Sequence, residues 1–191
     1  MSFDLVYPHT KKFEGGYAND PVDRGGETFR GISRRHHPAW PGWPLIDAAK
    51  RSGLISVQVI DGHFADNLEM ARLVESFYHQ NFYHPMLRFT DRPRPVAKLF
   101  DAGVNLGVGG AVRLAQRIVE TTADGVIGPL TQAAAMSFFS RRGEQEFIEL
   151  FCVAQIQHYL TLAKNDPSQE RFINGWIRRG LWQPLFGLSE A

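Results

Sequence analysis

The stretch 14-EGGYANDPVDRGGETFRGIS-33 decides how this chain folds near its N-terminus, because it is dense in residues that reverse the backbone. Residues 19–21 (NDP) and 23–26 (DRGG) are two candidate turns, since Asn, Asp, Pro and Gly each favour turn geometry for a physical reason. The segment from Tyr17 to Gly31 is therefore predicted to form a small irregular β-hairpin.

A short helix is expected just before this hairpin. Apolar residues recur at helical spacing between Phe3 and Phe13, Ser2 is a candidate N-cap, and Gly15-Gly16 provides a place for the helix to stop. This reading places Glu14 at the end of a helix, directly in front of the hairpin.

Beyond a loop at residues 36–44 that is rich in proline and tryptophan, the apolar spacing is helical almost throughout. Gly128-Pro129 is predicted to open one helix, because proline is favoured at the first helical position. The sequence therefore predicts an α+β fold that is mainly α-helical, with a small β-hairpin near the N-terminus. The other downstream helices are predicted over residues 65–78, 95–104, 111–120, 144–164 and 169–179.

Composition narrows the class of protein. The 191 residues carry 21 Lys and Arg against 20 Asp and Glu, a net charge of +1, so no bulk positive field favours nucleic acid as a partner. No apolar run approaches the roughly 20 residues of a membrane span. The single Cys152 leaves no intrachain disulfide to form, and its place on the apolar face of a long helix favours a buried, inert thiol.

Three polar residues of the opening stretch suggest catalysis. Glu14 lies at the helix end, Asp23 in the hairpin turn and Thr28 on the return arm, and a hairpin brings its turn and return strand back toward its base. Glycoside hydrolysis requires such a set: one carboxyl group protonates the leaving oxygen while a second acts from the other side of the sugar ring. Thr28 can help Asp23 to hold a water. The alternative is that Asp23 is only the acceptor of an Asx-turn.

The motif E-G-G-Y, followed by N-D-P and D-x-G-G-x-T-x-x-G-I-S, resembles the signature of the glycoside hydrolase 108 family. These are bacterial and prophage N-acetylmuramidases that include secretion-activating proteins. Phage-type lysozymes, which include endolysins, are similar in logic. Their pattern is E-x8-D-x5-T, whereas Glu14, Asp23 and Thr28 form E-x8-D-x4-T, with one residue fewer before the threonine.

The resemblance continues through most of the chain. Residues 99–116 are similar to the F-D-x-x-V-N-x-G segment of the family, and residues 124–131 (DGVIGPLT) to its C-terminal predicted peptidoglycan-binding region. The resemblance implies a lysozyme-like fold, cleavage of the β-1,4 bond between N-acetylmuramic acid and N-acetylglucosamine, and no cofactor. It also implies a catalytic lobe at residues 1–92 and a helical peptidoglycan-binding lobe at 93–191.

Four residues are candidate sugar contacts: Tyr17, Asp20, Asp101 and Asn105. Asp101 and Asn105 are four apart and would share one face of a helix, although Asn105 has an alternative as a cap before Gly107. The 124–131 motif likewise has an alternative as a turn followed by a helix start.

The four tryptophans and seven histidines also have more than one interpretation. Trp176 and Trp182 favour the core, while Trp40 and Trp43, in a loop, are candidates to line a groove. The seven histidines include no H-E-x-x-H pattern, so no metal site is predicted.

The sequence thus predicts a peptidoglycan hydrolase in which Glu14 is the general acid. Its alternative is a catalytically silent wall-binding or secretion-assembly module with the same fold. The N-terminus lacks the basic and apolar regions of a secretory signal. Synthesis in the cytoplasm, action in the periplasm or cell wall, and a holin-like export partner are the corresponding expectations.

Overall fold

The computed structural model describes residues 3–12, 14–19 and 26–185, and the chain divides into two compact units, residues 2–81 and 82–191. The π-helical turn η2 (His79–Tyr83) spans the point of division. The boundary expected from the sequence, after residue 92, lies further along the chain, beyond η2 and the short helix α5 (His84–Met86).

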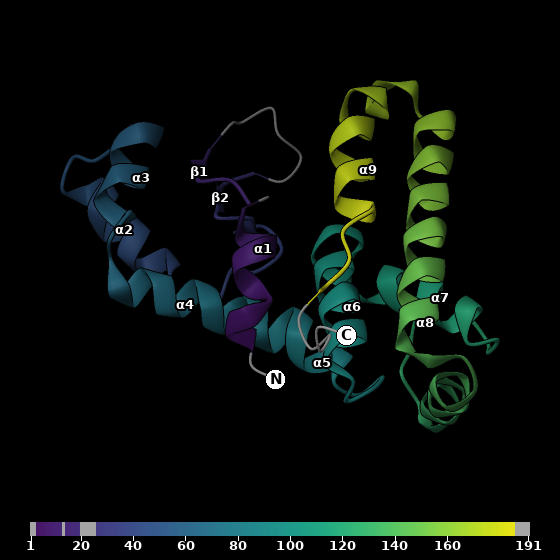
Figure 1. Ribbon diagram of the computed structural model, residues 1–191. Coiled ribbons are helices and arrows are strands. Elements are labelled where there is room, and N and C mark those ends of the chain that lie inside the picture. The colour runs from purple at the N-terminus through teal and green to yellow at the C-terminus, as the bar shows by residue number, and fades with distance from the viewer. Residues whose placement is uncertain (1–2, 13, 20–25, 186–191) are drawn as a thin grey trace. The chain divides into compact units, whose positions relative to one another are not determined.

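The unit at residues 2–81 combines a small sheet with short helices (Figure 1). Side-chain caps start two of its helices: Asn67 accepts a hydrogen bond from the Met70 amide at 2.8 Å, and Ser56 accepts one from Val59 at 3.3 Å. The expected helix before Glu14 is present but ends earlier, at Lys11, and its candidate cap Ser2 lies outside the described residues. In chain order the elements are η1 (Phe3–Leu5), α1 (Tyr7–Lys11), β1 (Tyr17–Ala18), β2 (Thr28–Phe29), β3 (Ile32–Ser33), α2 (Trp43–Arg51), α3 (Val57–Phe64) and α4 (Leu68–Tyr78).

The predicted hairpin is confirmed, and a third strand extends it. The antiparallel sheet has the order β1-β2-β3, with Tyr17 opposite Phe29 and Thr28 opposite both Ala18 and Ser33. Each strand has only two residues, so the sheet depends on packing against the helices for its stability.

Aromatic rings form the core of this unit. Trp40 packs 6.1 Å from the Phe29 ring and 5.0 Å from the Trp43 ring, measured between centroids. Both tryptophans are buried, with 5% and 2% of their surface exposed. The loop predicted at 36–44 therefore folds into the core, and its last two residues already belong to α2, which the apolar spacing did not predict.

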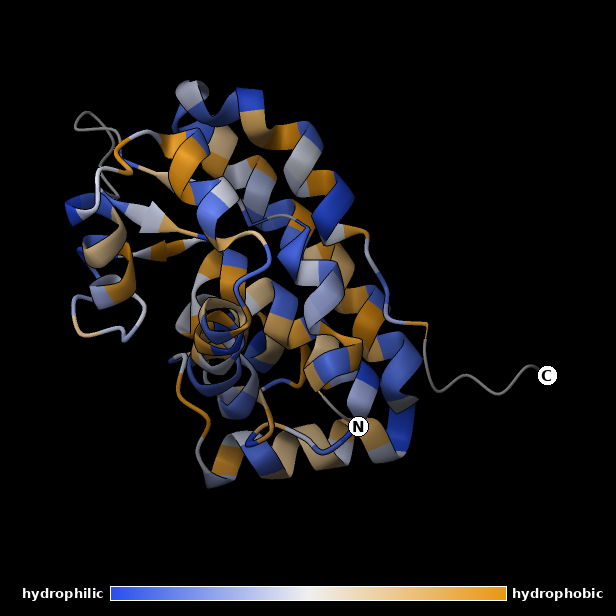
Figure 2. Ribbon diagram, turned by 90° about the vertical axis from the view of Figure 1, so that its left-hand side faces the viewer, coloured by the Kyte–Doolittle hydropathy of each residue, from blue (hydrophilic) through white to orange (hydrophobic). Residues whose placement is uncertain are grey.

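The unit at residues 82–191 is helical in its described part, which ends at residue 185. Helix α6 packs against α7 and α8, and α8 packs against α7 and α9. Orange and blue alternate along the helices in Figure 2, so each has an apolar and a polar face. The elements after α5 are α6 (Pro93–Leu106), α7 (Val108–Ile118), α8 (Pro129–Asn165), η3 (Pro167–Phe172) and α9 (Ile173–Gly180).

Helix α8 consists of two helical parts that run in different directions (Figure 1). The break is Gly143, whose φ of 78° and ψ of 175° are not helical and suit a residue without a Cβ. The sequence predicts both parts, one opening at Gly128-Pro129 and one covering residues 144–164. Within the described residues, none of the helices is long and apolar enough to cross a bilayer.

Buried charged groups on one face of α6 hold residues 180–184. Lys98 Nζ donates to the carbonyls of Gly180 (2.7 Å) and Trp182 (2.8 Å), and Arg94 Nε donates to the carbonyl of Pro184 (2.7 Å). The carbonyls of Gly180, Trp182 and Pro184, at the end of α9 and just after it, thus all accept from α6 side chains. Burial lowers the pKa of Lys98 below its ordinary value.

Candidate active site

Glu14 lies just beyond α1, where the backbone leaves the helix for the sheet. Its amide donates to the carbonyl of Lys11 at 3.2 Å, and the residue is half-buried. Glu14 therefore precedes the hairpin as predicted, but it lies beyond the end of α1 and not at it.

The tight turn between β2 and β3 packs against the Glu14 carboxylate. Its two central residues, Arg30 and Gly31, have φ values of 45° and 78°, the combination that a two-residue type I′ hairpin turn requires. A Cβ on Gly31 would lie 2.5 Å from the Tyr78 hydroxyl oxygen and even closer to Glu14 Oε2. The Glu14 carboxylate and the Tyr78 hydroxyl therefore converge on a surface that only glycine leaves open.

This turn is fixed by hydrogen bonds from three directions. The Arg30 amide donates to the Gly16 carbonyl at 2.9 Å, the Tyr78 hydroxyl donates to the Arg30 carbonyl at 2.8 Å, and Arg30 Nη2 donates to the Phe64 carbonyl at 3.1 Å. The residue just before strand β1, together with helices α4 and α3, thus holds the surface against which Glu14 rests.

Two buried tyrosines border the same place. Tyr7 and Tyr78 have 5% and 2% of their surface exposed, and their ring centroids are 5.5 Å apart. Burial raises the pKa of Tyr7, and the negative charges of Glu75 and Glu14 add to the rise while Arg30 opposes it. The Tyr7 phenol therefore stays neutral, with the Glu14 charge and the Arg30 cation both within electrostatic range of it.

The structure describes Thr28 but not the two predicted turn acids. Thr28 lies half-buried in β2, in the strand whose end forms the Arg30-Gly31 turn. Asp20 and Asp23 lie outside the described residues. The structure therefore places Glu14 and Thr28 in one unit, with Glu14 just before the sheet and Thr28 within it.

Tyr17, predicted to contact sugar, is instead a support of the sheet. Only 4% of its surface is exposed, and its hydroxyl donates to Glu27 Oε1 at 2.8 Å. Glu27 in turn forms ion pairs with Lys50 of α2 and, at 2.7 Å, with Arg34. Burial raises the pKa of Tyr17. We therefore leave Tyr17 out of the proposed sugar contacts.

Two acidic residues near the site were not singled out from the sequence. Glu27 is one, and its ion pairs join the sheet to α2. Asp61 of α3 is the other: its carboxylate accepts the Tyr17 amide and fills the space beside Gly16. Neither has a local pattern that marks it, because each acquires its partner from a distant part of the sequence.

Asp101 and Asn105 lie on α6, in the other unit, and each contacts a residue of a neighbouring helix. Asp101 is completely buried and paired with Arg179 Nε at 3.1 Å, so its carboxylate does not face solvent. Asn105 is half-buried, and its Oδ1 accepts the Tyr159 hydroxyl at 2.6 Å. Among the described residues the side-chain Nδ2 of Asn105 has no acceptor. Only Asn105 of this pair therefore keeps side-chain donors for a ligand.

The 124–131 motif encloses a buried glutamine. Gln116 Nε2 donates to Asp124 Oδ1 at 2.7 Å and to the Thr131 hydroxyl at 3.0 Å, while its Oε1 accepts the Gly125 amide at 2.8 Å. These hydrogen bonds explain the motif as a turn that leads into α8, which is the alternative that the sequence left open.

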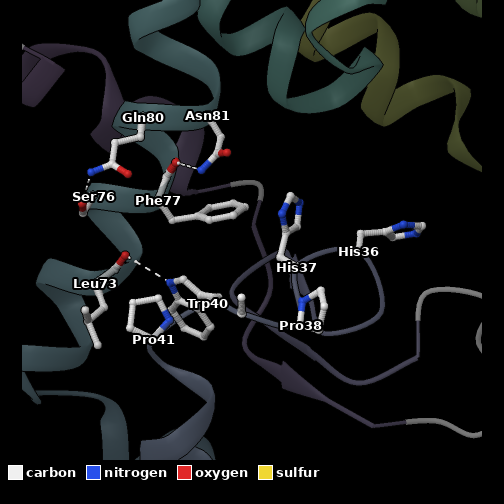
Figure 3. Close-up of a pocket in the computed structure, with 11 residues that line it drawn as sticks. His36, His37, Pro38, Trp40, Pro41, Leu73, Ser76, Phe77, Gln80 and Asn81 are labelled. Atoms are coloured by element: carbon white, nitrogen blue, oxygen red, sulfur yellow. Dashed lines mark hydrogen bonds between the residues drawn. The ribbon is translucent and has the colours of Figure 1, made fainter.

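A cavity of about 460 Å³ lies between the 36–41 loop and α4 (Figure 3). The rings of His37 and Phe77 stand edge to face, 4.7 Å apart, and Trp40 contributes to the wall while its Nε1 donates to the Leu73 carbonyl. Trp40 thus lines a hollow as predicted for this loop, whereas Trp43 is buried and donates to the His37 carbonyl at 2.7 Å.

Metal-binding groups of three or more His, Cys, Asp or Glu side chains are not found in the described part of the chain. Cys152 is buried and free of disulfide bonds, with its Sγ 3.8 Å from the Trp182 carbonyl.

The fold and the site together define a lysozyme-like protein of the α+β class. A helical body carries one small antiparallel sheet, and a glutamate lies where the N-terminal helix meets that sheet. The chain belongs to the glycosyl hydrolase 108 family, whose model matches residues 7–107. A predicted peptidoglycan domain matches residues 110–181. The protein is therefore a glycoside hydrolase that acts on peptidoglycan.

A solved structure, that of Brucella abortus SagA, is similar along almost the whole chain. It has 24% sequence identity and a TM-score of 0.55, and the match covers 94% of this chain and 93% of that one. This similarity concerns the fold. No curated protein matches the chain.

Proposed function

We propose that this protein is an N-acetylmuramidase, which hydrolyses the β-1,4 bond between N-acetylmuramic acid and N-acetylglucosamine with Glu14 as general acid. The observation that carries the proposal is the position of the Glu14 carboxylate, against a glycine turn that is held by three other elements. A catalytic acid has to be held in a fixed geometry, because misplacement by about 1 Å can cost about 100-fold in rate.

In this mechanism the Glu14 carboxyl group donates its proton to the glycosidic oxygen as the bond to the anomeric carbon breaks. Asp23 activates a water or stabilises the positive charge that develops on the sugar ring, and Thr28 orients that water. The neutral phenol of Tyr7 supports this assignment, because it lies within electrostatic range of Glu14 without adding a charge. Asp20 and Asn105 remain the proposed contacts to sugar hydroxyl and N-acetyl groups.

Hydrolysis of purified peptidoglycan tests the proposal. The wild type is expected to release new reducing ends, and Glu14→Gln is expected to release almost none while keeping its circular dichroism spectrum and melting temperature. Glu69→Gln is the matched control: it makes the same chemical change at an exposed position in the first turn of α4, and it should hydrolyse at the wild-type rate.

The identity of the new ends tests the bond specificity. Borohydride reduction followed by acid hydrolysis should convert the reducing-end residue to muramitol. Glucosaminitol would instead indicate cleavage of the other glycosidic bond, and it would refute the muramidase assignment while leaving the hydrolase. An active Glu14→Gln variant would remove Glu14 from the mechanism. Absence of any hydrolysis by the folded wild type would favour the silent wall-binding or secretion-assembly module.

Endolysin, secretion-activator and prophage roles, and a holin-like export partner, stay predictions. Expression of the chain in a bacterial host with and without a co-expressed holin tests the export route. Lysis that depends on the holin is the expected result, and equal lysis in both cultures would contradict it.

A further inference from the structure

A groove of about 720 Å³ runs between α7 and the second part of α8, inside the region that matches the predicted peptidoglycan domain. Aliphatic side chains form most of its walls. Leu114 and Ile118 come from α7, and Leu150, Val153 and Ala154 come from α8. Val153 keeps 53% of its surface exposed, so the apolar wall is open to solvent.

Arg117 supplies the charge of this groove. It is exposed, and within the described residues its side chain has neither a hydrogen bond nor an ion pair. The buried arginines of the same unit are engaged: Arg94 bonds a backbone carbonyl and Gln145, and Arg179 pairs with Asp101. Arg117 is therefore a guanidinium on the groove wall whose five donors are available to a ligand.

The rest of the lining leaves this positive charge uncompensated. No Asp or Glu is among the described residues of the groove. Burial lowers the pKa of His158, and the nearby charge of Arg117 lowers it further, so His158 is neutral at neutral pH. A ligand in the groove thus meets one permanent cation beside an aliphatic wall.

We propose that this groove binds the peptide stem of peptidoglycan, with a free stem carboxylate on the Arg117 guanidinium and alanine methyl groups against the aliphatic wall. The planar guanidinium matches a carboxylate in a two-point hydrogen bond. The proposal rests on peptidoglycan being the substrate, and it does not depend on which residues are catalytic.

The glycan strand fits this groove less well. Sugar rings stack on aromatic faces, and the described lining holds no Trp, Tyr or Phe, in contrast to the cavity at the 36–41 loop with its Trp40 and Phe77 rings (Figure 3). A neutral sugar also leaves the Arg117 charge without a partner. Charge and shape therefore both favour the peptide part of the polymer.

Titration calorimetry of the full chain tests this proposal with three probes: a free stem tetrapeptide, the same peptide with its carboxylates amidated, and chitotetraose. The free peptide is expected to bind. Arg117→Gln and amidation of the peptide are each expected to weaken binding about tenfold or more, as for loss of a hydrogen bond between two charged groups. Val153→Glu should also weaken it, because it places a carboxylate on the exposed wall.

Arg141→Gln is the matched control. Arg141 is exposed in the first part of α8, outside the groove, and its Nε donates only to the Ser137 carbonyl of its own helix. This variant should bind the peptide as the wild type does. The proposal is overturned if the wild type does not bind the peptide, if Arg117→Gln and Arg141→Gln bind it equally, or if amidation has no effect. It is also overturned if chitotetraose competes with the peptide.

Glu14→Gln separates this proposal from the catalytic one. That variant should lose hydrolysis and keep peptide binding, whereas Arg117→Gln should lose peptide binding and still hydrolyse a glycan that has no stem peptides. Failure of one assay thus leaves the other interpretable.

Discussion

The substitution Gly31→Ala examines the proposed catalytic site most directly. The backbone of Gly31 has a φ of 78°, where a residue with a Cβ costs roughly 1–2 kcal/mol. The new methyl group would also lie 2.5 Å from the Tyr78 hydroxyl oxygen and closer still to Glu14 Oε2. Tyr78 is buried and held by its hydrogen bond to the Arg30 carbonyl. The half-buried Glu14 side chain is therefore the group that must move.

Displacement of the Glu14 carboxylate by about 1 Å is expected to reduce the rate of peptidoglycan hydrolysis about 100-fold. Gly53→Ala is the control, because Gly53 has a φ of 95° but open space around its Cβ position. It should lower the melting temperature as a strained backbone does and leave hydrolysis unchanged. A folded Gly31→Ala variant that hydrolyses peptidoglycan as fast as Gly53→Ala would refute the reasoning that Glu14 must rest against this turn.

Three further predictions concern stability. Asp101→Ala removes the carboxylate that pairs with the buried Arg179 guanidinium and should lower the free energy of unfolding by about 3–5 kcal/mol in urea titrations; a loss below about 1 kcal/mol would contradict the importance of this pair. Burial raises the pKa of Tyr159 from 10.0 to about 12, so the folded state keeps a proton that the unfolded state loses. Stability should therefore fall by about 2–3 kcal/mol as the pH rises from about 10 to about 12, and Tyr159→Phe should show a shallower fall than the wild type. Glu120 has a φ of 59° after α7, so Glu120→Gly should raise the free energy of unfolding by up to about 1 kcal/mol, and an unchanged melting temperature would argue against strain there.

Local patterns predicted the elements that local physics determines. Turn residues between Tyr17 and Gly31 predicted the hairpin, and Gly128-Pro129 predicted the start of α8. Helical spacing predicted α4, α6, α7 and the second part of α8 within a few residues of their bounds. It did not predict α2 and α3, which are short helices of nine and eight residues with only three and two buried side chains.

The resemblance of one short motif predicted the family, and the match over residues 7–107 confirmed it. Burial was not predictable in the same way. Tyr17 and Asp101 have side chains that suit sugar recognition, but both are buried. Tyr17 donates to Glu27, which forms an ion pair with Lys50, and Asp101 forms an ion pair with Arg179. Each therefore depends on a segment far along the chain. The identity of a polar residue does not reveal whether a distant segment covers it.

The sequence by itself determined the α+β class, the hairpin after Glu14 and the membership in the glycosyl hydrolase 108 family, because these depend on residues that are close together in the chain. Only the tertiary structure decided that Gly31 and Tyr78 back the Glu14 carboxylate and that the Arg117 side chain, among the residues the structure describes, has no partner in its aliphatic groove. The physical reason is that contact and burial arise between segments separated by tens of residues, whose meeting depends on the packing of the whole unit.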